Sequence, residues 1–156
     1  MRVFTGLGEV RAAVGEHLGY SDYQAITQDD IDAFAALTGD DQWIHTDPGR
    51  AADGPFGGTI AHGLLTLSLG PRHAKSIYRI DGMAMSVNYG YDKIRFPSPV
   101  RVDSKIRLGA TLSSVTDVPS CSGNALRSPM PRPITRCGSS APCRRRRTVF
   151  RSSRGL

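Results

Sequence analysis

The stretch of sequence that decides the fold is IAHGLLTLSL, which runs from Ile60 to Leu69. Its leucines fall on more than one side of a helical cylinder, and a helix that is apolar nearly all round is a buried helix. We therefore predict a buried helix from Ile60 to about Tyr78. Pro71 should kink or restart this helix, because proline lacks the amide that would bond four residues back.

After this helix the hydrophobic period changes to two, which is typical of strands. Apolar residues alternate with small or polar ones over residues 83–89 and again over residues 106–112. A shorter extended piece contains Val100 and Val102. The chain is therefore predicted to be α+β, with one buried helix followed by antiparallel strands that could wrap around it.

Two further helices are predicted upstream, the first over residues 9–18. Thr27 should cap the second, because its hydroxyl can bond the helix while Asp30 reaches back toward the cap amide. Gly39 should end this helix, since glycine tolerates the left-handed conformation. The next segment, residues 40–55, is polar and is predicted to be a loop. The buried face of the second helix is predicted to consist of Ile31, Phe34, Ala35 and Leu37.

Charge divides the chain into a body and a tail. The net charge of +6 hides a difference: residues 1–118 carry 11 Lys and Arg against 14 Asp and Glu, whereas residues 119–156 carry nine Arg and no acid. Only five of the 38 tail residues are Leu, Ile, Val or Phe, a composition typical of disorder. We predict a folded domain over 1–118 and an Arg/Pro/Ser-rich tail over 119–156.

The tail allows three interpretations: a disordered extension, an out-of-frame translation of the normal end of the domain, or a patch for nucleic acid or another anionic surface. Nucleic acid is not expected as a partner, because the tail lacks regularly interleaved aromatic residues for base stacking. Its three cysteines, at positions 121, 137 and 143, show no C-x-x-C spacing and have no nearby histidine, so a zinc or redox site is not predicted there.

The sequence shows no apolar run long enough to cross a bilayer and no apolar secretory segment at the N-terminus. We therefore expect a cytoplasmic protein without a membrane partner.

Candidate catalytic residues follow the predicted end of the second helix. Asp40 and His45 stand five residues apart and, in a loop that doubles back, could converge on one water molecule. The carboxylate would accept its proton while the imidazole orients the water or delivers a proton elsewhere. The alternative is that Asp40 is an exposed turn residue and His45 an ordinary half-buried histidine.

The entry to the buried helix offers further candidates. The amide of Gly63 could bind a developing oxyanion at the positive end of the helix dipole, although glycine also serves plain packing. His62 is a second candidate acid or base, or else a capping or packing residue. No metal site is predicted: ligands could be assembled on paper, but no compact ligand spacing is present. That assembled set would be His45, Asp47, His62 and His73.

Two strings resemble the signature of the MaoC-like (R)-specific enoyl-CoA hydratases, also called hydratase 2. They are TGDDQWIHTDP over residues 38–48 and GPFGGTIAHGLLTL over 54–67, which combine a G-D-x-N/Q-x-x-H pattern with an I-A-H-G helix entry. A later string, NYGYDKIRFPSPV over 88–100, resembles the strand region that follows in these proteins. The resemblance covers residues 5–118. Gln42 and Trp43 stand where commoner members have Asn and Pro, and a Gln-Trp subgroup is familiar.

The resemblance implies a hot-dog fold, in which an antiparallel sheet wraps around one long helix, usually in a homodimer. It implies that Asp40 and His45 activate water for addition to a trans-2-enoyl-CoA, that Gln42 orients this pair and that the Gly63 amide polarises the thioester carbonyl. The product would be an (R)-3-hydroxyacyl-CoA. No metal or redox cofactor would be required, and coenzyme A would enter as part of the substrate.

Two alternatives to an active hydratase remain open. One is another acyl-thioester activity of the same fold, either thioester hydrolysis or acyl-CoA binding without turnover. The other is an inactive, frameshifted hydratase, because the fold normally ends in two long strands where this chain has its tail. We therefore expect the fold to be incomplete at the C-terminus.

Overall fold

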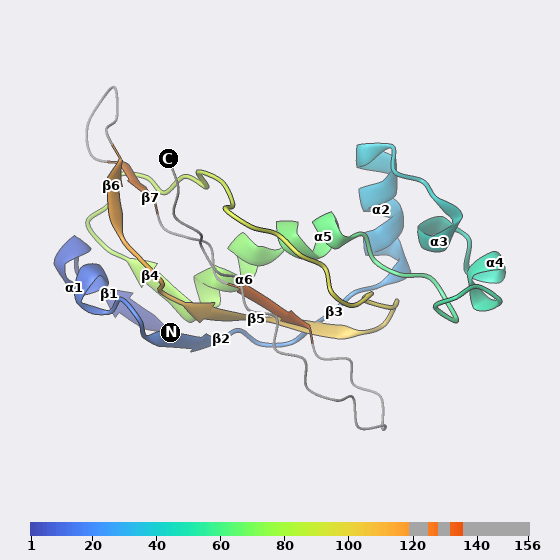
Figure 1. Ribbon diagram of the computed structural model, residues 1–156, viewed down its shortest axis with the longest axis horizontal. Coiled ribbons are helices and arrows are strands. Elements are labelled where there is room, and N and C mark those ends of the chain that lie inside the picture. Colours follow the sequence, from blue (N-terminus) through green and yellow to red (C-terminus); the bar gives the residue numbers. More distant parts are fainter. Residues whose placement is uncertain (119–124, 128–131, 136–156) are drawn as a thin grey trace.

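The computed structural model describes residues 1–118, 125–127 and 132–135 (Figure 1). The helices within these residues are α1 Leu7–Ala12, α2 Gln28–Thr38, α3 Trp43–Thr46, α4 Pro48–Ala52, α5 Gly63–Ser68 and α6 Gly70–Ile77. The strands are β1 Arg2–Phe4, β2 His17–Tyr20, β3 Gln24–Ala25, β4 Tyr78–Ile80, β5 Lys105–Thr111, β6 Thr116–Val118, β7 Ala125–Arg127 and β8 Arg132–Thr135. None of these helices is long and apolar enough to cross a membrane.

Strand β5 is the centre of the main sheet and confirms the strand predicted around residues 106–112. It pairs antiparallel with β2, β3 and β8. Ile106 pairs with both Gln24 and Thr135, so β8 lies on the edge of β5 opposite β3. Two smaller pairs complete the strands: β1 runs parallel to β4, and β6 runs antiparallel to β7.

Helices α5 and α6 follow one another along one face of this sheet (Figure 1). Helix α6 packs against β5 and β2, and its Ile77 is buried with Leu108 and Ala110 of β5. The predicted helix start at Ile60 is wrong, because helical structure begins at Gly63. The predicted restart at Pro71 is confirmed, because α6 begins at Gly70. Pro71 occupies the first turn of α6, where its missing amide costs nothing.

The main apolar cluster anchors α2 and α5 to the sheet. It consists of Ile26, Ile31, Ala61, Leu65, Val100 and Ile106, all buried. The expectation of a helix apolar nearly all round is wrong at Leu64, whose side chain is 58% exposed. Helix α2 likewise buries only one face. At 100° per residue Leu37 lies about 120° round the helix from Ile31, which explains why Leu37 is exposed and does not belong to the buried stripe.

His73 of α6 is buried and is bonded to Ser21, with 3.0 Å between its Nδ1 and the Ser21 Oγ. The Ser21 Oγ also accepts the Leu108 amide of β5. Burial, followed by the nearby Arg72 charge, lowers the pKa of His73 below its ordinary value. The neutral imidazole is therefore favoured in this packed position.

The predicted cap of α2 is confirmed. The Thr27 hydroxyl accepts the Asp30 amide, and the Asp30 carboxylate accepts the Thr27 amide at 3.0 Å. Gly39 ends the helix in the left-handed conformation, with φ of 74° and its amide donating to the Ala35 carbonyl. This turn determines where the next residue, Asp40, lies.

Replacing Thr27 with Ala is expected to lower the free energy of unfolding by about 1 kcal/mol, because the capping hydroxyl is lost from an exposed helix end. Urea titration followed by circular dichroism measures the change. Thr27→Ser is the matched control, because it keeps the hydroxyl and should retain most of the stability. Equal losses in the two variants would contradict the capping role.

Two predicted elements differ from the structure upstream of the site. The helix predicted over residues 9–18 is present as α1 but ends at Ala12, so its predicted extent to residue 18 is wrong. Gly15 has φ of 96°, which a helix does not continue through, and residues 17–20 instead pair with β5 as strand β2. The segment predicted as a loop over residues 40–55 contains the short helices α3 and α4, and Asp47 starts α4 by accepting the Arg50 amide.

The strand predicted over residues 83–89 is not formed. None of the described strands pairs with this segment, and Met85, Val87 and Tyr89 are largely exposed. An alternating pattern makes a strand only when a neighbour takes up its backbone hydrogen bonds and a core covers its apolar face. Residues 83–89 have the alternating pattern, but within the described residues they have neither a pairing strand nor a core that covers their apolar face.

The described part of the segment after residue 118 consists of two short strands, β7 and β8, which the sequence pattern did not indicate. Through β8 this segment adds a strand to the main sheet. Residues 119–124, 128–131 and 136–156 lie outside the described residues. The domain boundary at residue 118 and the disordered or frameshifted nature of the tail therefore stay predictions.

Candidate active site

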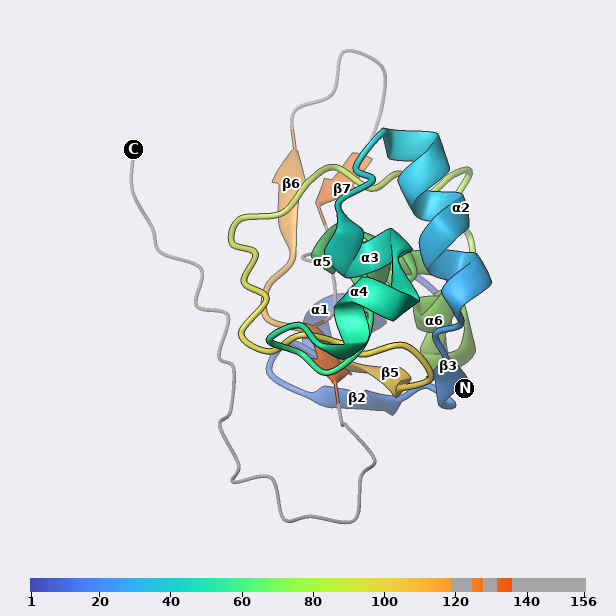
Figure 2. The ribbon, with the colours of Figure 1, turned by 90° about the vertical axis from the view of Figure 1, so that its right-hand side faces the viewer.

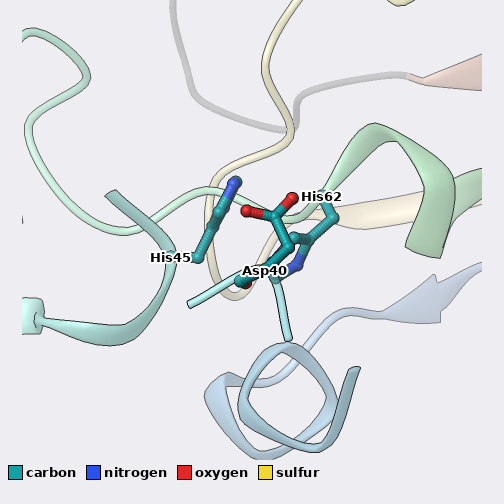
Figure 3. Close-up of side chains that lie close together, drawn as sticks. All are labelled: Asp40, His45 and His62. Carbon is teal, nitrogen blue, oxygen red and sulfur yellow. The ribbon is translucent and has the colours of Figure 1, made fainter. Parts of the chain in front are cut away.

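Three segments bring one acid and two imidazoles together (Figure 3). Asp40 follows the Gly39 turn at the end of α2, His45 lies in α3, and His62 directly precedes α5. One carboxylate oxygen and one ring nitrogen from each histidine all lie within 4.8 Å of one another. We call these three residues the acid–imidazole cluster.

His45 is held by backbone groups on both sides. Its ring Nδ1 lies 2.6 Å from the Ile60 carbonyl, and its own carbonyl accepts the Gln28 side-chain amide at 2.8 Å. A carbonyl oxygen can only accept, so His45 Nδ1 carries the proton. In the neutral ring the other nitrogen, Nε2, is then an acceptor. His45 is only 6% exposed, so little solvent is available to compete for its hydrogen bonds.

His62 links the other two members of the cluster. Its Nε2 donates to the backbone carbonyl of Asp40 at 2.8 Å, and its ring stacks on His45 with 3.7 Å between centroids. The Phe34 ring packs on it at 5.1 Å. His62 Nδ1 is buried and has no hydrogen-bond partner among the described residues. This histidine therefore positions Asp40 and His45 and retains one unused nitrogen.

Asp40 is the exposed member of the cluster. Figure 3 shows its carboxylate beside the imidazole rings of His45 and His62. The predicted orienting residue, Gln42, approaches it with 3.5 Å between the side-chain nitrogen and Asp40 Oδ1, which is long for a hydrogen bond. The carboxylate thus stays accessible to a small molecule from solvent.

Gly63 is the first residue of α5, so its amide belongs to the helix turn that has no intrahelical acceptors. The Phe96 ring lies directly against it: a Cβ on Gly63 would be 2.5 to 2.8 Å from three Phe96 ring atoms. Phe96 is 45% exposed, so this side of the helix entry is covered by a ring that remains partly in solvent.

The structure brings together Asp40, His45 and His62, and Gly63 directly follows His62 in the chain. It does not assemble the ligand set that could be written on paper from His45, Asp47, His62 and His73. Within the described residues Asp47 instead caps α4 and His73 bonds Ser21. The set that could hold a metal ion contains Asp40 in place of these two.

Sequence reasoning missed three contacts of the site. The Ile60 carbonyl determines the tautomer of His45, the Phe34 ring packs on His62, and Phe96 covers Gly63. Ile60 and Phe96 both lie in the strings that resemble the hydratase signature, which is the signal that could have marked them. Their contacts join segments that are far apart in the chain, so residue spacing alone could not have revealed these contacts.

The arrangement suits the activation of water. A carboxylate oxygen of Asp40 and a ring nitrogen of His45 lie within 4.8 Å, a separation that one water molecule can bridge because each hydrogen bond spans about 2.8 Å. A carboxylate and a neutral imidazole nitrogen then share its two protons, and either can take one as the oxygen attacks.

Comparison with known proteins places the chain in a family. The model of the MaoC-like domain matches residues 9–124. The chain is 49% identical over 118 residues to 3-hydroxyacyl-thioester dehydratase Z of Mycobacterium tuberculosis, covering 76% of this chain and 78% of that protein.

Solved structures show the same fold. The R-hydratase PhaJ1 from Pseudomonas aeruginosa aligns with a TM-score of 0.55 and 20% identity, over 83% of this chain and 90% of that one. The (R)-hydratase from A. caviae involved in PHA biosynthesis aligns with a TM-score of 0.54 and 25% identity, over 78% and 84%. The fold is therefore the predicted α+β hot-dog fold. The chain belongs to the MaoC-like dehydratase family of hydro-lyase enzymes.

Proposed function

We propose that the chain adds water to a trans-2-enoyl-CoA to give the (R)-3-hydroxyacyl-CoA, and catalyses the reverse dehydration. The observation that carries this proposal is the acid–imidazole cluster, in which an accessible carboxylate and a tautomer-fixed imidazole lie within 4.8 Å. The relatives support the substrate class, because one is named a 3-hydroxyacyl-thioester dehydratase and another an (R)-hydratase.

In the proposed reaction Asp40 and His45 Nε2 hold one water by its two O–H groups. As the water oxygen forms its bond to C3, one O–H bond breaks and its proton passes to this pair. The electrons of the C2–C3 double bond move toward the thioester carbonyl. Asp40 and His45 then deliver a proton to C2. The residues take one proton from water and return one to C2, so the reaction balances without a redox step.

Negative charge develops on the thioester oxygen during this step. We assign its stabilisation to the Gly63 amide at the start of α5, because a fixed donor there gains strength as charge appears. His62 is assigned a positioning role: its bond to the Asp40 carbonyl and its stacking on His45 keep both groups in place. Gln42 is assigned a weaker orienting role on the Asp40 carboxylate, in line with its 3.5 Å contact.

We also propose that the enzyme works as a homodimer, as the resemblance implies. Met85 and Val87 are 73% and 69% exposed in a segment with a strand-like pattern but without a strand partner among the described residues. Covering such side chains with a second copy would remove apolar surface from water, at a gain of about 25 cal/mol per Å².

The proposed function is tested with the purified 156-residue chain and crotonyl-CoA. We expect the ultraviolet absorbance of the enoyl thioester to fall while no free thiol appears. A thiol reagent in a parallel reaction detects hydrolysis, and butyryl-CoA, which has no double bond, is the control substrate. Thiol release from both substrates would instead establish a thioesterase. Tight binding of crotonyl-CoA by a folded chain without any turnover would establish a binding protein.

A further inference from the structure

We propose that the acid–imidazole cluster is also a binding site for a divalent transition-metal ion, with Zn²⁺ as the reference ion, and that the bound ion inhibits hydration. The binding part stands on the geometry alone. The inhibition part rests on the proposed function, and the two are measured separately below.

The donor set of the cluster is the first support for this proposal. One carboxylate oxygen and two imidazole nitrogens is a combination that binds Zn²⁺ in proteins, with bond lengths of about 2.0 to 2.2 Å. The three ligand atoms lie within 4.8 Å of one another. Ligand atoms on a tetrahedral Zn²⁺ lie about 3.4 Å apart at these bond lengths, so the three side chains must move closer together to share a single ion.

The backbone hydrogen bonds of the two histidines are the second support. A metal-bound histidine usually donates its other ring N–H to a carbonyl or carboxylate, which fixes the tautomer and the ring direction. Here His45 Nδ1 donates to the Ile60 carbonyl and His62 Nε2 donates to the Asp40 carbonyl. Each neutral ring therefore retains one nitrogen with a free lone pair.

The unused nitrogen of His62 is an independent observation that points to a ligand. The side chain is 97% buried by area, since only 3% is exposed, and its Nδ1 has no partner among the described residues. A buried polar atom without a hydrogen bond costs about 1 to 3 kcal/mol. Coordination would give this nitrogen the partner that the protein does not supply.

The stacking of the two rings limits how the ion binds. Their planes differ by only 25° at 3.7 Å between centroids, so their in-plane lone pairs run nearly side by side. One ring must turn before both nitrogens reach the same ion. Binding should therefore separate the stacked rings, and imidazole proton signals that are shifted by ring stacking should move when Zn²⁺ is added.

Inhibition follows from which lone pairs the ion occupies. The proposed hydration uses the Asp40 carboxylate and His45 Nε2 as proton acceptors for water. A metal ion on the same atoms removes both acceptors and blocks the place of the water between them. The inhibition should be reversed by a chelator, because no bond of the protein is broken.

The binding experiment is a titration of the metal-free protein with Zn²⁺ in competition with a chromophoric chelator, without substrate. Zinc also binds thiolates, so the starting protein carries serine in place of the cysteines at positions 121, 137 and 143. We expect one Zn²⁺ per chain, and no comparable binding of Mg²⁺, which prefers oxygen ligands.

Two variants of this protein test the site. His62→Gln and Asp40→Asn should each weaken Zn²⁺ binding by at least about tenfold, since each removes one of three ligands. Asp40 is exposed, so Asp40→Asn is expected to fold even where His62→Gln does not. His17→Gln is the matched control, because His17 is an exposed histidine outside the cluster, and its affinity should equal that of the starting protein.

Each outcome decides one part of the proposal. Absence of Zn²⁺ binding, or equal binding by Asp40→Asn and the starting protein, overturns the metal site. Binding with unchanged or increased crotonyl-CoA hydration overturns the inhibition. A protein that binds Zn²⁺ at the cluster but hydrates no enoyl thioester retains the metal site and contradicts the proposed function instead.

Discussion

Replacing Asp40 with Asn is expected to lower kcat/KM for crotonyl-CoA hydration by about 100-fold or more, the size typical for loss of a general acid or base. The amide has nearly the shape of the carboxylate but cannot accept a proton from water. The hydrogen bond from His62 goes to the Asp40 backbone carbonyl, which this substitution leaves in place. Loss of activity should therefore come without loss of the fold, as circular dichroism and thermal unfolding can show.

Asp41→Asn is the matched control for this variant. It removes the same charge from the adjacent residue, and Asp41 is not a member of the acid–imidazole cluster. Its kcat/KM should stay within about threefold of the parent, because Asp41 is exposed and a solvated surface charge interacts only weakly with its neighbours. Equal losses in the two variants would attribute the effect to local charge, and retained activity in Asp40→Asn would remove Asp40 from the mechanism.

The parts of the site that could be predicted from sequence depend on local signals. The Thr27 and Asp30 pair, the Gly39 stop and the closely following Asp40 form one continuous segment, so backbone preferences alone determine their order in space. His45 follows Asp40 by five residues, in the short helix α3. These short-range rules are strong because few residues separate the interacting groups.

The parts that sequence reasoning missed depend on distant segments. The tautomer of His45 depends on Ile60, which is 15 residues away, and the Gly63 helix entry depends on Phe96. The alternating segment 83–89 shows the same dependence on distant segments. Its pattern satisfies the local rule for a strand, but pairing needs a neighbour that no local pattern specifies.

Replacing Gly63 with Ala is expected to lower kcat/KM by about 100-fold, comparable to the loss of one oxyanion donor. The new methyl group would stand at the helix entry, where the proposed mechanism places the thioester carbonyl. The change in the free energy of unfolding should stay below about 1 kcal/mol, because Ala is a better helix former than Gly. The Phe96 ring that would meet the methyl group must shift, and because Phe96 is 45% exposed it has solvent on one side into which it can move.

Phe96→Ala and the double variant Gly63→Ala/Phe96→Ala separate catalysis from packing. A Cβ at Gly63 meets Phe96 ring atoms at 2.5 to 2.8 Å, so removing the ring relieves any clash in the double variant. If the methyl group blocks the carbonyl, the double variant should remain about 100-fold below Phe96→Ala in kcat/KM. If the two have equal activity, Gly63 is a glycine because Phe96 packs on it, and the developing charge on the thioester must be stabilised by another donor.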